Sequence, residues 1–293
     1  MSAVATLPFV DTHLHFWDLL DPKLLYDWLQ PGPPHPLLGN IDTIKMPLYG
    51  SEQFLAESRF HNVKRTIHVQ AALGIPDPVE ETRWLEGLRE RTGVPHGIVA
   101  ATSLDARDVE HQLDRHADAS PGFRGIRDYA EGDYLRNAKW ERGFAALGER
   151  DLVCCLHLTC EDMEKARDLG RRFPQTALCV DHAGFPMQRD DEFFEHWRRG
   201  MRTVAEAESA VVKISGLGMF DNAWTVESIR PWVLACIEAF GVERSFFGTN
   251  WPVDRMYSSY GDVLDAYAEV IADFTPGEQM ALFSGNAERI FRI

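Results

Sequence analysis

Positive charge is scarce in this sequence. Its 293 residues include 30 Lys and Arg against 45 Asp and Glu, so the formal net charge is −15 at pH 7. A protein that neutralises phosphates needs a face rich in Lys and Arg, so this balance argues against nucleic acids and anionic membranes as partners. An acidic ligand would have to be held by a few local arginines.

Cysteine is also scarce, and its spacing excludes the common uses of paired thiols. The five cysteines are an odd number with no C-x-x-C pair, and four of them lie in or just after predicted strands. We expect reduced thiols, mostly buried, rather than a disulfide framework or a soft-metal site. They are Cys154, Cys155, Cys160, Cys179 and Cys236.

Long apolar runs are missing as well. No stretch of eighteen or more apolar residues occurs, and no charged segment followed by an apolar one opens the chain. We therefore expect a cytoplasmic protein whose partner is a small molecule rather than a membrane. A homodimer is compatible with the sequence.

Short apolar runs of strand length do occur, and they alternate with helical patterns. The runs are near-continuous and rich in β-branched residues, as in parallel strands buried on both faces. They lie at 8–13, 63–69, 97–101, 123–127, 152–157, 177–182, 210–214 and 245–249. Helical patterns lie at 78–92, 105–118, 161–173 and 226–240, with Asp105 and Thr225 as predicted N-caps. Eight such units predict one (β/α)8 barrel domain over residues 1–293, although a doubly wound open sheet would alternate in the same way.

Two segments interrupt this alternation. Residues 18–50 contain six prolines together with Trp28 and Tyr49, and they follow the first predicted strand. In a barrel this position lies over the C-terminal mouth, and the aromatic content favours an ordered lid over a linker. The glycine-containing segment 215–225 is a second loop on the same face.

Polar residues close most of the apolar strands, which is where barrel enzymes keep their chemistry. They are His13, His15, Gln70, Arg124, Arg127, His157, Asp181, His182, Lys213, Ser215, Asn250 and Asp254. A single histidine at such a position is often only a hydrogen-bonding residue, and that interpretation applies to His157, and to His68 within the second strand. His13 and His15 are two apart and share a face, so both should point into the barrel.

The two arginines of the fourth strand are three residues apart, so they should face opposite ways. We expect Arg127, at the strand end, to line the mouth. There its guanidinium could bind a carboxylate with two parallel hydrogen bonds, or donate to hydroxyls.

The strand-end motifs together resemble the amidohydrolase-related group of the amidohydrolase superfamily. They are DTHLHFWD at 11–18, HVQAA at 68–72, GIRD at 125–128, DHAGFP at 181–186, VKISGL at 212–217 and FGTNWPVD at 247–254. This group includes sugar-acid lactonases, a pyrone-dicarboxylate lactonase and, more distantly, aminocarboxymuconate-semialdehyde decarboxylase.

The resemblance implies a barrel that hydrolyses a lactone or related carbonyl compound at its C-terminal mouth. His13 and His15 match the first-strand histidines of the group, His182 matches its sixth-strand histidine, and Arg127 matches a substrate-contacting arginine. In metal-dependent relatives such histidines hold a divalent ion, commonly zinc, whereas several lactonases of the group work without one. The sequence leaves both cases open.

One position departs from the family pattern. The eighth strand usually ends in SDWP or TDWP, whose aspartate acts as general base or metal ligand, and here that residue is Asn250. An amide cannot take up a proton at neutral pH, so the usual assignment fails. Asp254, four residues on, could supply a carboxylate instead. The change also weakens a zinc site of three histidines, because it removes the anionic fourth ligand.

These positions lead to a mechanistic hypothesis. His13, His15 and His182 polarise a lactone carbonyl directly or through a metal, Arg127 fixes a substrate carboxylate or hydroxyl, and Asp254 or a histidine deprotonates the attacking water. Asn250 completes the catalytic set. Further candidates for substrate contacts are Gln70, His157, Trp17, Trp28, Tyr49 and Lys213.

Two other functions remain open from the sequence. The same site could perform metal-dependent decarboxylation or carbon–carbon hydrolysis of an acidic ring-cleavage product. Alternatively, Asn250 could mark a barrel that has lost catalysis and only binds a sugar acid.

Overall fold

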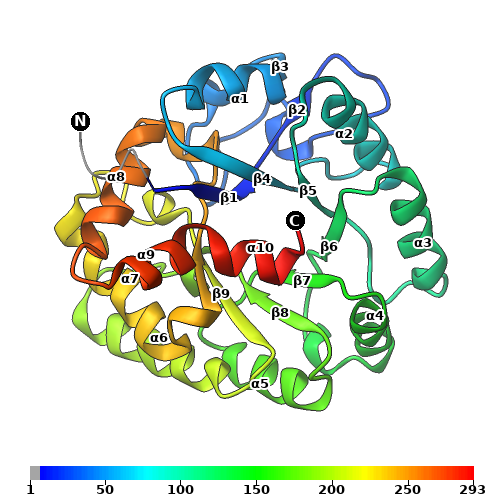
Figure 1. The fold of residues 1–293 in the computed structure, drawn as a ribbon. Coiled ribbons are helices and arrows are strands. Elements are labelled where there is room, and N and C mark those ends of the chain that lie inside the picture. Colours follow the sequence, from blue (N-terminus) through cyan, green and yellow to red (C-terminus); the bar gives the residue numbers. More distant parts are fainter. Residues whose placement is uncertain (1–6) are drawn as a thin grey trace.

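The computed structural model describes residues 7–293, so the first six residues of the predicted domain lie outside the described range. In the described part, eight parallel strands form a nearly closed barrel in chain order (Figure 1). They are β1 (Phe9–Leu14), β4 (Val63–Val69), β5 (Gly97–Ala100), β6 (Phe123–Arg127), β7 (Val153–Leu156), β8 (Ala177–Val180), β9 (Ala210–Ile214) and β10 (Ser245–Phe247). Because neighbouring strands follow chain order, the predicted (β/α)8 barrel is confirmed and the doubly wound sheet is wrong.

The barrel closes between its first and last strands through a few specific contacts. The His15 N–H donates to the Trp251 carbonyl at 2.8 Å, just beyond both strand ends. Below that point, the buried Asp11 carboxylate accepts from the Thr249 N–H at 3.0 Å and from the Thr249 hydroxyl at 2.6 Å. One backbone bridge, between Leu14 and Trp251, and these side-chain hydrogen bonds thus join the first and last strands.

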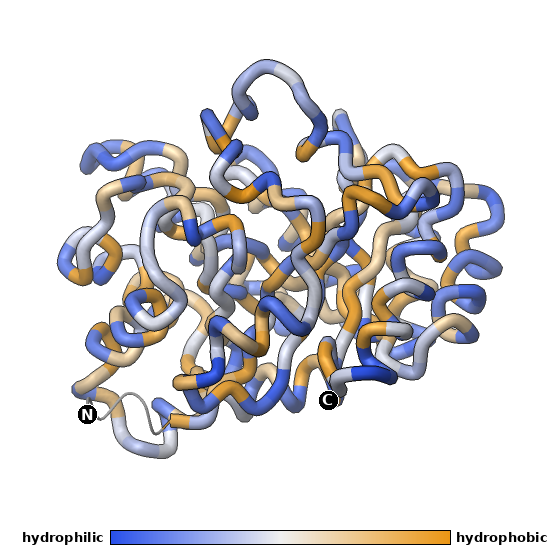
Figure 2. Tube along the Cα trace, turned by 90° about the horizontal axis from the view of Figure 1, so that it is seen from above, coloured by the Kyte–Doolittle hydropathy of each residue, from blue (hydrophilic) through white to orange (hydrophobic). Residues whose placement is uncertain are grey.

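Helices surround the strands. They are α1 (Ser51–Ser58), α2 (Val79–Thr92), α3 (Val109–Ala119), α4 (Ala138–Glu149), α5 (Met163–Arg172), α6 (Asp191–Ala205), α7 (Val226–Phe240), α8 (Tyr260–Val270), α9 (Pro276–Met280) and α10 (Asn286–Phe291). In Figure 2 the outer segments alternate between hydrophilic and hydrophobic colours, as expected for helices with one buried face. Among residues 7–293, no helix is long and apolar enough to cross a membrane.

Of the two predicted N-caps, one is confirmed and one is wrong. The Thr225 hydroxyl accepts from the Ser228 N–H at the start of α7, as a cap should. Helix α3 begins only at Val109, because Asp105 belongs to a preceding turn in which its carboxylate accepts from the Ser103 hydroxyl at 2.7 Å.

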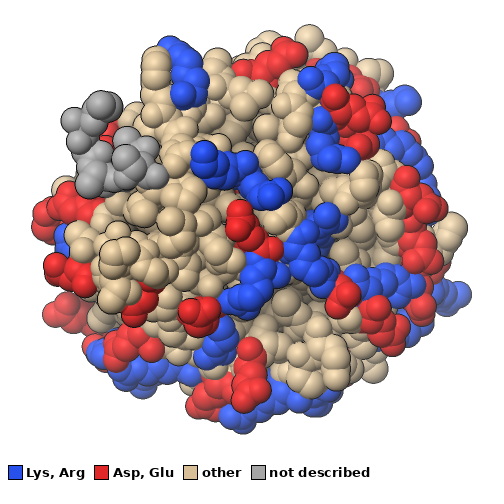
Figure 3. All heavy atoms as spheres, viewed as in Figure 1, with Lys and Arg blue, Asp and Glu red and all other residues tan. Residues whose placement is uncertain are grey.

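The C-terminal helix α10 covers the N-terminal end of the barrel. Phe291 and Ala287 join the apolar cluster inside the barrel, beside Val10 and Val211. Figure 3 views this end, where Lys and Arg side chains lie among Asp and Glu. This closure leaves the opposite end, with the strand C-termini, as the open mouth.

The segment 18–50 is ordered against that mouth, as the sequence predicted. Strands β2 (Trp17–Asp18) and β3 (Leu48–Tyr49) pair antiparallel at its base. The Trp28 indole N–H donates to the Ala71 carbonyl at 2.9 Å, which ties the lid to the loop after β4.

Candidate active site

A cavity of about 310 Å³ lies at the C-terminal mouth beneath the lid. Its volume falls at the lower end of the range for small-molecule sites, roughly 300–1,000 Å³. Seven of the residues singled out in the sequence line it: His15, Trp28, Gln70, Arg127, His157, His182 and Asn250. The C-terminal strand ends bring six of these residues together, and the lid adds Trp28.

Sequence reasoning missed most of the apolar wall. Tyr129 and Phe185 also line the cavity; Tyr129 directly follows the GIRD motif and Phe185 lies within DHAGFP, so these motifs could have pointed to them. Met219 comes from the second loop, 215–225, which was expected on this face. Leu37 and Leu38 come from the lid and carry no sequence signal of their own, because a loop's path depends on what it packs against.

His15 has a defined tautomer. Its Nδ1 lies 2.8 Å from the Val69 carbonyl oxygen, which can only accept, so Nδ1 carries the proton and Nε2 is an unprotonated acceptor. Burial and the positive charge of Arg127 lower the pKa of His15 well below 6.5. A neutral imidazole with a free lone pair therefore stands at the cavity wall at neutral pH.

His182 is presented by an unusual backbone. His182, Ala183 and Phe185 all have positive φ, at 50°, 52° and 52°, a conformation that costs energy in non-glycine residues. Packing holds this turn, since the Trp197 indole donates to the Ala183 carbonyl at 2.8 Å. The same turn stacks Phe185 on His157, with ring centroids 3.5 Å apart.

The His182 ring is held from behind by the β9 loop. Its Nδ1 lies 3.0 Å from the Ser215 hydroxyl. Burial, followed by the charges of Arg127 and Lys213, lowers the pKa of His182 well below its ordinary value, so this ring is also neutral at pH 7.

Gly216 allows this close approach, which leads to a first prediction. A Cβ at Gly216 would lie 2.6 Å from His182 Nδ1, and its φ of +64° already disfavours other residues. Gly216→Ala should therefore displace His182 and lower kcat, measured with whichever substrate the wild type turns over. Gly93→Ala is the matched control, because Gly93 has φ +79° but nothing within 4 Å. Equal activity losses in the two variants would mean that backbone strain, and not the position of His182, is responsible.

His13 lies beneath the cavity, not at its surface. Its side chain is fully buried, and its Nε2 lies 3.2 Å from Arg127 Nη1. Because a guanidinium can only donate, this nitrogen is the acceptor. His13 Nδ1 then carries the proton and faces Asp181 Oδ1 at 4.0 Å, beyond hydrogen-bond range.

Arg127 points into the barrel. The Arg124 guanidinium instead donates to backbone carbonyls, among them that of Arg292 at the N-terminal end of the barrel. The two side chains thus face opposite ways, as their spacing predicted. Arg127 Nε donates to Gln70 Oε1 at 2.7 Å, and Nη2 donates to the Gln70 carbonyl at 2.7 Å and to Gln70 Oε1. With His13 included, four of its five N–H groups are engaged within the protein.

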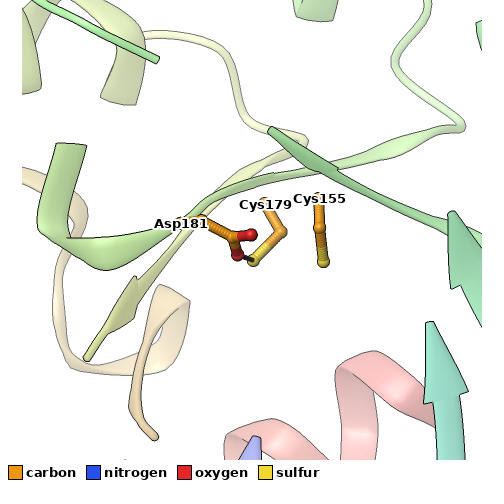
Figure 4. A group of neighbouring side chains, drawn as sticks. All are labelled: Cys155, Cys179 and Asp181. Atoms are coloured by element: carbon orange, nitrogen blue, oxygen red, sulfur yellow. Dashed lines mark hydrogen bonds between the residues drawn. The ribbon is translucent and has the colours of Figure 1, made fainter. Parts of the chain in front are cut away.

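Lys213 lies deeper still and does not reach the cavity. Its ammonium is fully buried and lies 2.9 Å from Asp181 Oδ1 and 3.5 Å from Cys155 Sγ. Burial opposes the charge, but Asp181 and the neighbouring thiols together raise the pKa of Lys213, so it stays protonated. Figure 4 shows Cys155, Cys179 and Asp181 directed to one side of β7 and β8.

This cluster accounts for two of the thiols. All five cysteines are free, and four are buried, as predicted. Cys155, Cys179 and Asp181 are the one group of three or more possible metal ligands found close together within residues 7–293, with atoms all within 4.8 Å. The Lys213 ammonium already supplies the positive charge there, so the group does not fit a metal ion.

Asn250 lines the cavity and Asp254 lies behind it. Asn250 Nδ2 donates one of its two N–H groups to Asp254 Oδ1 at 2.9 Å, which leaves the second N–H available to a ligand. Burial raises the pKa of Asp254 to about 7. The carboxylate that was expected to enter the site is thus separated from the cavity by an amide that cannot relay a proton.

Three of the other named side chains have structural partners. The Trp17 indole donates to the Met46 carbonyl at 2.9 Å, and the Tyr49 hydroxyl donates to Glu57 Oε2 at 3.2 Å, so both lie in the base of the lid. His68 points out of the barrel toward Glu81, with Nε2 and Oε1 3.3 Å apart. The interpretation of His68 as an ordinary hydrogen-bonding residue fits this placement.

The three histidines do not fit a divalent ion as they are arranged. Their rings converge, with centroids 4.9 Å apart for His13 and His15 and 4.3 Å apart for His13 and His182. However, His13 Nε2 accepts from Arg127, so an ion bound at that nitrogen would meet a guanidinium at close range. Asn250 supplies no negative charge to offset it.

Comparison with known proteins agrees with this architecture. The amidohydrolase family model matches residues 10–293. The chain is 36% identical over 303 residues to the uncharacterised protein y4mH of Sinorhizobium fredii, covering 99% of this chain and 100% of that protein. It is 28% identical over 301 residues to an L-fucono-1,5-lactonase of Burkholderia ambifaria, covering 97% of this chain and 95% of the relative.

A solved structure matches along nearly the whole chain. The crystal structure of an amidohydrolase from Burkholderia multivorans with bound zinc superposes with a TM-score of 0.83 at 24% identity, covering 97% of this chain and 99% of the other. This chain belongs to the amidohydrolase family, as its motifs indicated, and it is a hydrolase.

Proposed function

We propose that the protein opens a lactone by attack of water on the carbonyl carbon, with His15 as general base. The supporting observation is the His15 Nδ1 contact with the Val69 carbonyl at 2.8 Å, which leaves Nε2 unprotonated at the cavity wall. A positioned imidazole of this kind typically contributes about 10²–10⁴-fold to a rate. The lactonase among the relatives, although only 28% identical, supports the choice of substrate class.

The remaining steps follow from the donors around the cavity. His15 Nε2 accepts a proton from water, and the resulting hydroxide adds to the carbonyl carbon. The oxygen that gains negative charge is stabilised by the free N–H of Asn250 Nδ2 and the remaining N–H of Arg127 Nη1. When the ring bond to oxygen breaks, protonated His15 returns its proton to the leaving alkoxide, and a hydroxy acid is released.

The other polar residues have positioning roles in this proposal. His13 and Gln70 orient the Arg127 guanidinium. Asp254 accepts a hydrogen bond from Asn250 Nδ2 and so fixes the orientation of that amide. His182 supplies a second neutral ring, whose centroid lies 4.3 Å from that of His13. Phe185 and His157 form a stacked pair that packs against the bound ring.

We propose that this reaction needs no divalent metal, because Arg127 donates to His13 Nε2 and Asn250 supplies no negative charge. Purified protein, assayed on a panel of δ- and γ-lactones before and after dialysis against EDTA, should open the same lactones at the same rates. Elemental analysis of both samples is the control. Stoichiometric zinc, with activity that is lost on chelation and restored by zinc, would contradict the proposal.

The pH profile distinguishes His15 from Asp254 as the base. A base must be unprotonated, and the pKa of His15 lies well below 6.5, so kcat/KM should stay level from pH 8 down to about 6. If Asp254, with its pKa raised to about 7, were the base, kcat/KM would fall about tenfold per pH unit below that value. Titration of the released acid at constant pH, in a pH-stat, measures the rate across this range.

The products test the reaction class. Lactone hydrolysis releases one hydroxy acid and consumes one water, whereas decarboxylation releases carbon dioxide and requires a carboxylated substrate. Mass spectrometry of reactions in H₂¹⁸O should find one labelled carboxylate oxygen. Carbon dioxide release from a carboxylated substrate without label incorporation would contradict lactone hydrolysis and indicate decarboxylation.

A further inference from the structure

We propose that the preferred substrate is a neutral lactone carrying an apolar substituent, in place of a polyhydroxylated sugar lactone or a carboxylated one. This proposal rests on the proposed lactone hydrolysis and concerns what the cavity accepts. Three features of the cavity support it: the engagement of its cation, a lining that within residues 7–293 includes no Ser, Thr, Asp or Glu, and the apolar face of the lid.

The cavity has no two-pronged site for a substrate carboxylate. Arg127 is the one permanently charged cation among its lining residues in the described part of the chain. Four of the five Arg127 N–H groups bond to Gln70 and His13, and the remaining one belongs to Nη1, which also lies 3.8 Å from Asp181 Oδ2. A carboxylate could receive at most one hydrogen bond there, which does not compensate for removing a full charge from water.

The cavity also offers few partners for several sugar hydroxyls. Within residues 7–293, no Ser, Thr, Asp or Glu lines it. Its polar side chains include Tyr129 and the lid residue His35, but most of them follow strand ends beside the reacting carbonyl, and His15 and Asn250 already have tasks in the reaction. Hydroxyls placed against the other walls would lose water without gaining protein partners, which strongly disfavours binding.

The lid turns an apolar surface toward the cavity. Residues 35–39 form a tight turn in which the His35 N–H donates to the Gly39 carbonyl at 2.8 Å and the Gly39 N–H donates back at 2.9 Å. His35 Nδ1 accepts from the N–H groups of Leu37 and Leu38 at 3.2 and 3.1 Å, so His35 supports the turn and its Nδ1 is not available to a ligand. The two leucines held in this way line the cavity beside Trp28.

Other lining residues are apolar as well. They are Phe185, Met219 and Val253, so a ligand whose carbonyl lies at the barrel end meets hydrocarbon from these residues and from the lid. A ring of five or six atoms with a short alkyl chain matches this distribution, with the chain directed toward the lid.

The test compares δ-octalactone, L-fucono-1,5-lactone and 2-pyrone-4,6-dicarboxylate, with each kcat/KM divided by the uncatalysed hydrolysis rate of the same lactone at the same pH. We expect kcat/KM for δ-octalactone to exceed that for each of the others by about 100-fold. Faster opening of the sugar lactone or of the dicarboxylate would overturn this inference while leaving the proposed lactone hydrolysis intact.

Binding of an unreactive analogue separates the two proposals if no lactone is opened. Calorimetric titration with 6-propyl-2-piperidone, a lactam shaped like δ-octalactone, is compared with titration using a polyhydroxylated δ-lactam. Tighter binding of the alkyl lactam supports the inference even without turnover, and equal or tighter binding of the hydroxylated lactam overturns it. Absence of turnover on all three lactones contradicts the proposed function instead.

A lid variant locates the preference. Leu37→Ser should reduce the preference for δ-octalactone over the sugar lactone by about tenfold, because it replaces part of the apolar lid surface. Leu20→Ser is the matched control, since Leu20 belongs to the same segment but is 75% exposed and does not line the cavity. An unchanged preference in Leu37→Ser would show that the lid turn does not set specificity.

Discussion

Replacing His15 with Ala lowers kcat for lactone opening by about 10²–10⁴-fold, the contribution expected of a general base. The physical reason is that the Val69 carbonyl holds the proton of the His15 imidazole on Nδ1, which leaves Nε2 as the acceptor. Alanine leaves no group there to take the proton from water. The measurement is kcat on the lactone that the wild type opens fastest, with the melting temperature recorded to confirm folding.

The control for this prediction is His111→Ala, which removes an exposed histidine of α3 and should leave kcat unchanged. His15→Gln adds a further comparison, because glutamine can still donate to the Val69 carbonyl but cannot act as a base. Activity within about threefold of wild type in His15→Ala would rule out His15 as the base, since a base contributes at least about 10²-fold.

Replacing Lys213 with Met lowers the free energy of unfolding by about 3–5 kcal/mol, because it leaves the Asp181 carboxylate buried without its main partner. The two groups are 2.9 Å apart and nearly without solvent exposure, so water cannot compensate. Arg127, 3.8 Å from Asp181 Oδ2, offers only partial relief. Urea unfolding followed by circular dichroism measures the loss.

The double variant Lys213→Met with Asp181→Leu tests the reason for that loss. Replacing a buried ion pair by apolar residues is often nearly neutral, so most of the stability should return. Lys165→Met, which breaks the partly exposed pair with Asp133, should lower stability much less than Lys213→Met. A double variant as unstable as the single one would mean that Lys213 stabilises the barrel through packing, not through its charge.

The buried ion pair also bears on the site above it. Asp181 lies under His13, and His13 Nε2 accepts from Arg127, so the positions of these groups are coupled from the barrel interior up to the cavity. We therefore expect the double variant to recover stability more fully than activity.

Much of this arrangement follows from the sequence. Eight β-branched apolar runs separated by helical patterns determine a parallel barrel, since strands buried on both faces must alternate with covering helices. A barrel then brings all strand C-termini to one mouth. For this reason the sequence by itself placed His15, His182, Gln70, Arg127 and Asn250 at one site.

Only the tertiary structure decided how deep each side chain lies and which partner it has. His13 and His15 share a face in the sequence pattern, yet Arg127 covers one while the other reaches the cavity, because spacing along a strand gives direction but not depth. Lys213 and Asp181 lie on different strands, so their pairing depends on barrel register. Trp28 reaches the cavity whereas Trp17 packs in the lid base, because the path of a long loop is set by distant contacts, which no local pattern records.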